Sequence, residues 1–409
     1  MSECVVTGYG DVMDLSFLRA LYVHPGPWAS AYLDATPDTA DAARAVSLRW
    51  RGLRESLAGQ GAGAAVLTAM DRALDGVPAE PDRRGIALFA SEAAPDDVTV
   101  ERLPTPPRAD LARFGALPHT MPLIAQRGEE VGWLRVVADR TGGEVSAFDT
   151  GGVRPGASVP PPGEAGAVPP TGTVRRSETV RGHESYPIRK VKPGGWSQAR
   201  YQREAETTWR RNTGDVAAAA TDLADALGPD VLVVAGDVRA RQLVLDQLPQ
   251  RWRERAVVTD AGTRAAGADP EPLDEATTIA VADVADRRTR DAVDKFGAQE
   301  GLGNGLAAVV TALRREQVEA MLIVDDPSST DELWIGPEPA QLALDPTQLL
   351  AMGVEEPVRV RADAALVRAI TGTGADLVLV GPDDADLRHG VGAILRYADE
   401  ATRQGEGNG

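Results

Sequence analysis

The stretch Arg-Lys-Val-Lys-Pro-Gly-Gly-Trp-Ser-Gln-Ala-Arg-Tyr-Gln-Arg-Glu at residues 189–204 carries the most information about this chain. Two of the protein's three lysines precede a Gly-Gly pair, and arginines recur after it. Between positions 175 and 211, ten basic residues stand against four acidic ones, although the whole chain carries a net charge of −18. A basic, glycine-containing loop in an otherwise acidic protein predicts a contact with phosphate-rich RNA.

Composition restricts what else the chain can be. A length of 409 residues predicts two to three domains. The single cysteine, Cys4, excludes a disulfide framework, and the four scattered histidines lack the spacing of metal ligands, so we expect neither a metal nor a cofactor. There is no apolar run of about 18 residues and no signal segment, which predicts a cytoplasmic protein without a membrane partner. The acidic balance argues against a general nucleic-acid coat, and we expect no DNA partner.

Hydrophobic patterning predicts an α/β protein of three parts. Strands are expected at 28–34, 85–90, 231–235, 320–324, 333–335 and 377–380, a hairpin at 131–148 around a Thr-Gly-Gly turn, and helices at 14–23, 39–57, 66–74, 273–300 and 363–370. Asp237 is expected to cap a further helix. The predicted domains are an N-terminal α/β domain at 1–125, a middle domain at 126–270, a C-terminal α/β domain at 271–400 and a disordered tail at 401–409.

The region around the basic stretch combines a loop with a long helix. Residues 150–172 contain six prolines and six glycines, which predicts that 150–188 form a flexible Pro/Gly-rich and basic loop. A helix is expected from Ser197 to Leu227, because the apolar residues Trp209, Val216 and Leu223 repeat every seven positions along it. Gly214 is a candidate break, since glycine costs roughly 1 kcal/mol relative to alanine inside a helix.

The segment Gly194-Gly195-Trp196-Ser197-Gln198-Ala199-Arg200-Tyr201 resembles, without gaps, the Gly-Gly-Gln-Ser-Ala-Leu-Arg-Phe segment of the archaeal and eukaryotic class I peptide-chain release factors. The bacterial branch of that superfamily, with the Balon-like ribosome hibernation factors of the actinobacterial type, is the part that the chain resembles most. The resemblance implies a ribonuclease H-like middle domain carrying the Gly-Gly loop and a C-terminal α/β domain of the Pelota and ribosomal-protein type. It covers most of the chain in architecture and about a dozen residues in motif.

The resemblance also implies a ribosomal site for the loop. The loop tip of these factors enters the peptidyl transferase centre, so ribosomal RNA becomes the expected partner and an elongation-factor GTPase a further one. The residues expected to contact ribosomal RNA are Lys190, Lys192, Gly194, Gly195, Trp196, Ser197, Arg200 and Arg203. Trp196 is suited to stacking on a base, which contributes about 1–3 kcal/mol.

One departure from the family motif changes the expected activity. Trp196 occupies the position of the glutamine that organises the hydrolytic water in release factors, and Gln198 is the local residue that would replace it as a catalytic group. The Asn-Ile-Lys-Ser signature of stop-codon recognition is missing from residues 1–125. The leading hypothesis is a protein that occupies the ribosomal A site in hibernation or rescue without reading a stop codon. Two alternatives stay open: a peptidyl-tRNA hydrolase that uses Gln198, and a non-ribosomal α/β protein whose basic loop binds another anion or partner.

Overall fold

A computed structural model describes residues 13–36, 42–77, 84–128, 131–148, 174–181, 195–262, 269–299 and 301–397. These residues fall into two compact units. The first contains the residues before 130 together with those from Arg288 onward, and the second contains the residues between them. The three-domain division at 1–125, 126–270 and 271–400 stays a prediction. Internal contacts group most of its first and third parts into one compact unit.

The first sheet of the first unit has four antiparallel strands in the order β3-β2-β1-β4. The predicted strand at 28–34 is β1, and its side chains alternate between two cores: Trp28 and Tyr32 enter one, and Leu33 enters the other. Helices α1 and α2 pack on the second of these faces, so the predicted α/β character is confirmed. The elements are η1 (Ser16–Tyr22), β1 (Trp28–Asp34), α1 (Ala42–Gly59), α2 (Ala64–Asp75), β2 (Gly85–Ser91), β3 (Ala94–Leu103), β4 (Leu111–Gly115) and α3 (Met121–Arg127).

The C-terminal part of the first unit contains two further three-stranded sheets. In the first, β10 pairs in parallel with β14 and antiparallel with β15, and in the second β11 lies between β12 and β13. The apolar strands expected from the sequence at 320–324 and 377–380 are β10 and β14. The elements are α8 (Leu306–Arg314), β10 (Val318–Val324), β11 (Glu332–Ile335), β12 (Leu342–Ala343), α9 (Pro346–Ala351), β13 (Val358–Arg361), α10 (Ala362–Thr373), β14 (Asp376–Val380), η2 (Arg388–Gly390) and β15 (Val391–Leu395).

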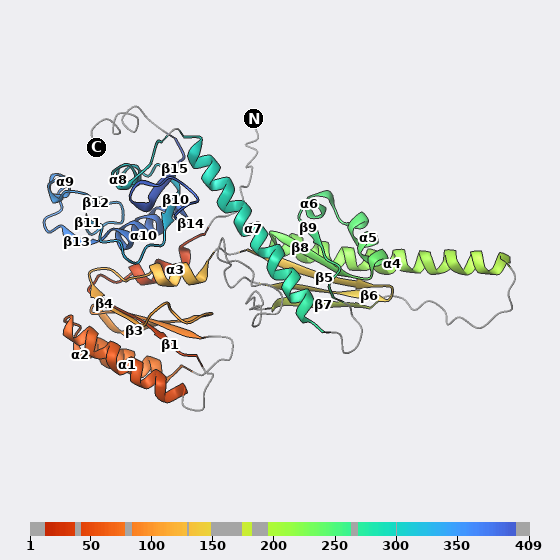
Figure 1. Cartoon of the computed structure of the whole chain (residues 1–409), viewed down its shortest axis with the longest axis horizontal. Coiled ribbons are helices and arrows are strands. Elements are labelled where there is room, and N and C mark those ends of the chain that lie inside the picture. The colour runs from red at the N-terminus through yellow and green to blue at the C-terminus, as the bar shows by residue number, and fades with distance from the viewer. Residues whose placement is uncertain are drawn as a thin grey trace. The chain divides into compact units, whose positions relative to one another are not determined.

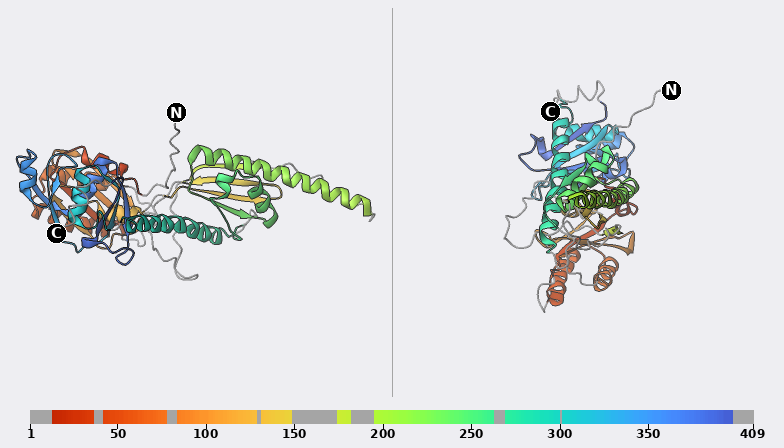
Figure 2. Two further views of the ribbon diagram at one scale, coloured as in Figure 1. Left: turned by 90° about the horizontal axis from the view of Figure 1, so that it is seen from above. Right: turned by 90° about the vertical axis from the view of Figure 1, so that its right-hand side faces the viewer.

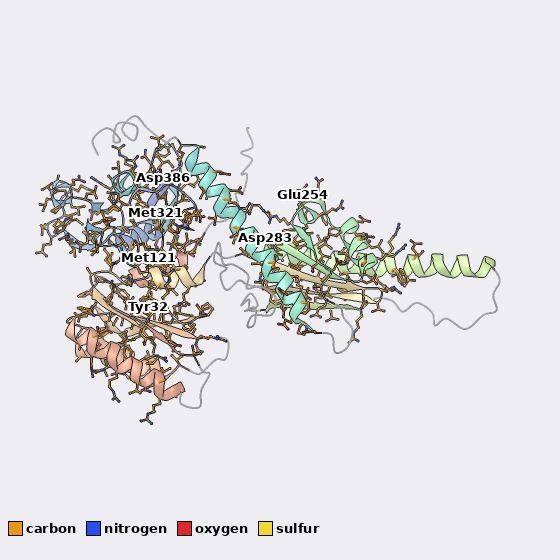
Figure 3. The ribbon with its side chains drawn as sticks, viewed as in Figure 1. Tyr32, Met121, Glu254, Asp283, Met321 and Asp386 are labelled. Carbon is orange, nitrogen blue, oxygen red and sulfur yellow. The ribbon has the colours of Figure 1, made fainter. Side chains whose placement is uncertain are left out.

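A single hydrophobic core joins the N-terminal and C-terminal parts of the first unit. Tyr32, Met121 and Met321, which Figure 3 labels, are all buried in one cluster. Backbone hydrogen bonds also connect the two parts, since Met13 and Leu377 each donate to the carbonyl oxygen of the other, at 3.1 and 3.0 Å. This shared core explains why residues so far apart in sequence form one compact unit.

The second unit is built on a five-stranded sheet in the order β7-β6-β5-β8-β9. Strands β5, β6 and β7 are antiparallel, and β8 and β9 continue the sheet parallel to β5. Helices α4 and α5 cover one face and the first part of α7 covers the other (Figure 2). This arrangement confirms the predicted ribonuclease H-like middle domain. The elements are β5 (Trp133–Asp139), β6 (Gly142–Phe148), β7 (Val174–Arg181), α4 (Gly195–Leu227), β8 (Val231–Gly236), α5 (Val238–Gln247), α6 (Gln250–Arg253), β9 (Ala256–Val258) and α7 (Glu271–Gly297).

Three local expectations need correction. Residues 174–181, predicted to belong to the flexible loop at 150–188, form the edge strand β7; edge strands tolerate the charges that make this segment read as a loop. Gly214 does not break α4, which is continuous, and a Cβ at this position would lie 2.8 Å from Oε1 of Gln247. The expected helix at 14–23 is the 3-10 helix η1. The rest of the predicted loop, residues 150–173 and 182–188, lies outside the described residues, as does the tail at 401–409.

No helix in the described part of the chain is both long enough and apolar enough to span a bilayer.

Candidate nucleic-acid interface

The residues predicted to contact RNA lie at and before the start of α4. Helix α4 begins at Gly195, so Trp196, Ser197, Gln198, Arg200 and Arg203 belong to its first turns. Lys190, Lys192 and Gly194 lie outside the described residues. The structure therefore assigns the motif to a helix start, as the sequence predicted, and fixes the element that carries it.

Helix α4 is long and runs past the sheet on which it packs (Figure 1). Its 33 residues correspond to about 50 Å at 1.5 Å per residue. The C-terminal half is buried against the sheet and α5 through Val216, Ala220 and Leu223, two of which belong to the predicted heptad stripe. The N-terminal part of α4 is thus an extension of a firmly packed helix.

The contact between α4 and the sheet depends on a glycine in β6. A Cβ at Gly143 would lie 2.8 Å from one γ-carbon of Val216 and 2.9 Å from the other. The absence of a side chain at this position allows the helix to approach the strand closely. Nearby, the Asn212 amide donates a 3.0 Å hydrogen bond to the carbonyl oxygen of Arg140 in the β5–β6 turn. These contacts fix the direction in which α4 leaves the domain.

Two arginines lie over the half-buried Trp209 of α4. The guanidinium carbon of Arg140, in the β5–β6 turn, is 4.9 Å from the ring centroid, and that of Arg239, in the first turn of α5, is 5.9 Å away. Both distances are within the range of cation–π attraction. We refer to Arg140, Trp209 and Arg239 as the arginine–tryptophan cluster.

The arginines of this cluster stay largely accessible to solvent. Their side chains are 61% and 57% exposed, although Arg140 lies 3.7 Å from an Asp237 carboxylate oxygen and Arg239 pairs with Glu206. Arg210 and Arg211, which follow Trp209 on α4, are also exposed. Sequence reasoning missed this cluster, because its three members come from segments 30 and 69 residues apart and only the fold brings them together.

The chain matches the model of bacterial archaeo-eukaryotic release factor family 2 over residues 133–302. Two uncharacterized proteins of Mycobacterium tuberculosis, Rv2629 and MT2704, are each 31% identical to it over 390 residues, which cover 93% of this chain and 96% of theirs. The chain belongs to the bacterial archaeo-eukaryotic release factor family. The resemblance found in the motif at 194–201 is thereby confirmed at the level of the family.

Solved structures of archaeal translation factors are similar at low identity. The archaeal translation termination factor aRF1 is 17% identical with a TM-score of 0.25, and the match covers 93% of this chain and 96% of that one. Archaeal Pelota, from a model of ribosome-bound Pelota and ABCE1, is 14% identical with a TM-score of 0.35, and the match covers 95% of both chains. The assignment of this chain to the release factor family rests on the sequence comparisons.

The ribonuclease H-like sheet of this family member has carboxylates at the ends of its parallel strands, but each has a local structural partner. Asp139 accepts hydrogen bonds from the backbone and hydroxyl of Thr141, both at 2.7 Å, and Asp237 caps α5 as the sequence predicted. Asp260 pairs with Arg241 at 2.5 Å. Within the described residues, no group of three or more histidine, cysteine, aspartate or glutamate side chains is arranged to hold a metal.

The first unit contains a cavity of about 480 Å³ between α3, α10 and the loops after β10 and β14. Asp386, labelled in Figure 3, lines it together with His119. Asp325 pairs with Arg108 at 3.1 Å, and Asp326 accepts from the backbone and hydroxyl of Ser328 at 2.9 and 2.6 Å. The Asp-Asp-Pro segment at 325–327 thus forms a turn whose carboxylates are bound internally.

Proposed function

We propose that this protein binds the bacterial ribosome in the A site and directs the loop before α4 toward the peptidyl transferase centre. The observation that carries the proposal is the position of the Gly-Gly-Trp-Ser-Gln motif, at the start of a helix that runs past its own sheet in a release factor family member. A helix extension of this kind delivers its first residues to a point remote from the domain that holds it. The basic residues of the motif supply the charge that phosphate binding needs.

In this proposal, binding in the A site serves ribosome hibernation or rescue, and it does not serve termination at a stop codon. Residues 1–125 contain neither the Asn-Ile-Lys-Ser signature nor any lysine. The protein therefore engages the ribosome independently of the codon. An elongation-factor GTPase, contacting the C-terminal half, is the proposed delivery partner.

The motif favours blocking the peptidyl transferase centre over hydrolysing peptidyl-tRNA. Trp196 replaces the glutamine that release factors use, and an indole ring stacks on a base but cannot offer the amide of glutamine to a water molecule. Gln198 lies two positions further on, within the first turn of α4. It provides the competing hypothesis, in which the protein is a peptidyl-tRNA hydrolase.

Puromycin reactivity tests this proposal, because puromycin must enter the same centre to accept the nascent peptide. Ribosomes carrying peptidyl-tRNA are incubated with the whole chain, and peptidyl-puromycin formation is measured. We expect the wild-type chain to suppress the reaction and a Trp196→Ala variant to suppress it less. Full puromycin reactivity at saturating, bound protein would contradict occupation of the centre.

Peptide release in the same reactions separates blocking from hydrolysis. We expect no release by the wild-type chain. Release that Gln198→Ala abolishes would instead establish the hydrolase hypothesis. Gln202→Ala, one turn further along α4, is the matched control for the substitution.

A further inference from the structure

The arginine–tryptophan cluster has the properties of a preorganised phosphate site. Arg140 and Arg239 come from a strand turn and a helix start, and both lie within 6 Å of the centroid of the Trp209 ring. Cation–π attraction at these distances favours a fixed position of each guanidinium group over the ring. A surface arginine that is already held in place loses less conformational freedom when it binds an anion than an arginine that moves freely.

The backbone at each arginine is fixed as well. The carbonyl of Arg140 accepts the Asn212 amide at 3.0 Å, and the turn that holds it is closed by Asp139 and Thr141. The amide of Arg239 donates to the Asp237 carboxylate at 3.0 Å as part of the α5 N-cap. Both guanidinium groups therefore project from anchored positions, and their side chains remain more than half exposed although each has one carboxylate neighbour.

A second pair of arginines lies near a tryptophan in the same unit and allows a comparison with the arginine–tryptophan cluster. Arg251 and Arg255 lie 5.9 and 5.4 Å from the centroid of the buried Trp252 ring. Arg251 donates to both Asp225 oxygens at 2.8 Å, and Arg255 donates to the carbonyl oxygen of Pro229 at 2.9 Å. Hydrogen bonds from Arg251 and Trp252 also lower the pKa of Asp225. Arg251 is 60% exposed, about as much as Arg140 and Arg239, and differs from them in binding both oxygens of one carboxylate.

Basic residues outnumber acidic ones around the arginine–tryptophan cluster, which favours the binding of an anion. Arg140 and Arg239, with Arg210 and Arg211 next to Trp209 in sequence, stand against Asp139, Glu206 and Asp237, in a chain whose net charge is −18. Trp209 lies 14 residues, or about 21 Å, along α4 from its start. The cluster therefore lies on the same helix as the basic motif, at the base of α4, which is the part next to the sheet. A ribosome that receives the start of α4 would also approach this part of the helix.

We propose that Arg140 and Arg239, positioned by Trp209, bind phosphates of ribosomal RNA at the base of α4. This inference rests on the proposed function, since it assumes that the ribosome is the partner. It adds a second RNA contact, separate from the loop tip. The planar guanidinium groups suit the oxygen pairs of phosphate groups.

The test is the salt dependence of ribosome binding by the whole chain, measured for wild type and for the double variant Arg140→Gln/Arg239→Gln. Each lost phosphate contact lowers the slope of log K against log salt by about 0.9, so the double variant is expected to have a slope smaller by about two. Arg140→Lys/Arg239→Lys keeps the charge and is expected to keep the slope. Arg251→Gln is the matched control and is expected to leave the slope at the wild-type value.

The outcomes distinguish this inference from the function on which it rests. If the wild-type chain does not bind ribosomes, the proposed function fails and the inference fails with it. If the wild-type chain binds and the double variant has the wild-type slope, the inference alone is overturned. Hydroxyl-radical footprinting identifies the partner: protection of ribosomal RNA that the double variant loses supports RNA. A changed slope with an unchanged RNA footprint assigns the cluster to an acidic protein and overturns the RNA proposal.

Discussion

Single residues of this protein differ in how much their sequence context reveals. Trp209 fits the predicted apolar stripe of α4, but two arginines lie over its ring. The sequence predicts the stripe because its seven-residue repeat lies within one continuous segment of the chain. It cannot predict the arginines, because Arg140 and Arg239 reach Trp209 only through the order of the strands in the sheet. The Gly-Gly motif, in contrast, is continuous in sequence and was found directly.

His119 is a residue whose role the sequence left open and whose environment leads to a prediction. Burial, the largest influence, lowers the pKa of its imidazole to about 4 from the usual 6.5, and its Nδ1 has no hydrogen-bond partner among the described residues. The unfolded chain therefore takes up a proton at higher pH than the folded chain does. The contribution of neutral His119 to stability is fully present above pH 6.5, falls as the pH falls toward 4, and amounts to roughly 3 kcal/mol when lost.

We therefore expect the first unit to lose about 2 kcal/mol of stability between pH 7 and pH 5, and the His119→Gln variant to lose much less. Native-state hydrogen exchange measures this, with amides of β10 reporting on the first unit and amides of β8 on the second. Tyr32 donates to the backbone carbonyl of His119 at 2.6 Å, so the substitution keeps that hydrogen bond. An equal pH dependence in wild type and variant would show that His119 titrates normally in the folded chain.

At the scale of elements, hydrophobic periodicity predicted the buried strands, the short strand at 333–335 and the long helices, and it missed polar edge strands. Strands β1, β8, β10 and β14 are apolar and were expected. Strands β3 and β7 are edge strands with charged residues, and their pairing is decided by a neighbouring strand that no local pattern reveals. The same physics explains the corrected boundary of the flexible loop.

The close packing of α4 on β6 gives a prediction about Gly143. A methyl group at this position would meet Val216, so Gly143→Ala is expected to destabilise the second unit by about 1–3 kcal/mol. Adding Val216→Ala makes room for the new methyl group, and the double variant should lose less stability than the sum of the two single variants. Urea unfolding followed through the amides of β8 measures both effects.

A control with the same chemical change is available in α1. In the described part of the chain, nothing lies within 4 Å of the position that a Cβ at Gly52 would take. A helix interior favours alanine over glycine, so Gly52→Ala should stabilise its helix by up to about 1 kcal/mol. Additive losses in the Gly143 and Val216 variants would contradict the steric contact between β6 and α4.

At the scale of the whole molecule, the family, the ribonuclease H-like unit and the α/β fold class were predictable from the sequence, because a motif and a succession of elements encode them. The joining of the N-terminal and C-terminal parts in one core was not predictable. The residues that build this core, such as Tyr32, Met121 and Met321, look like ordinary apolar residues of separate domains. Only their packing reveals the common unit.

This organisation predicts how fragments of the chain behave. A fragment of residues 131–287 keeps its own cores and should unfold cooperatively. A fragment of residues 1–128 loses the C-terminal half of the shared core, so it should expose apolar surface and lack a cooperative transition. Thermal unfolding followed by circular dichroism measures both. A cooperative transition in the 1–128 fragment would favour the three-domain division expected from the sequence.

A density map of the whole chain bound to bacterial ribosomes carrying P-site tRNA would show whether the start of α4 reaches the peptidyl transferase centre. We predict density for residues 190–198 in the peptidyl transferase centre, with Trp196 against a ribosomal RNA base and α4 leading back to a unit in the A site. Density for the chain at another ribosomal site, or for α4 pointing away from the centre, would contradict it.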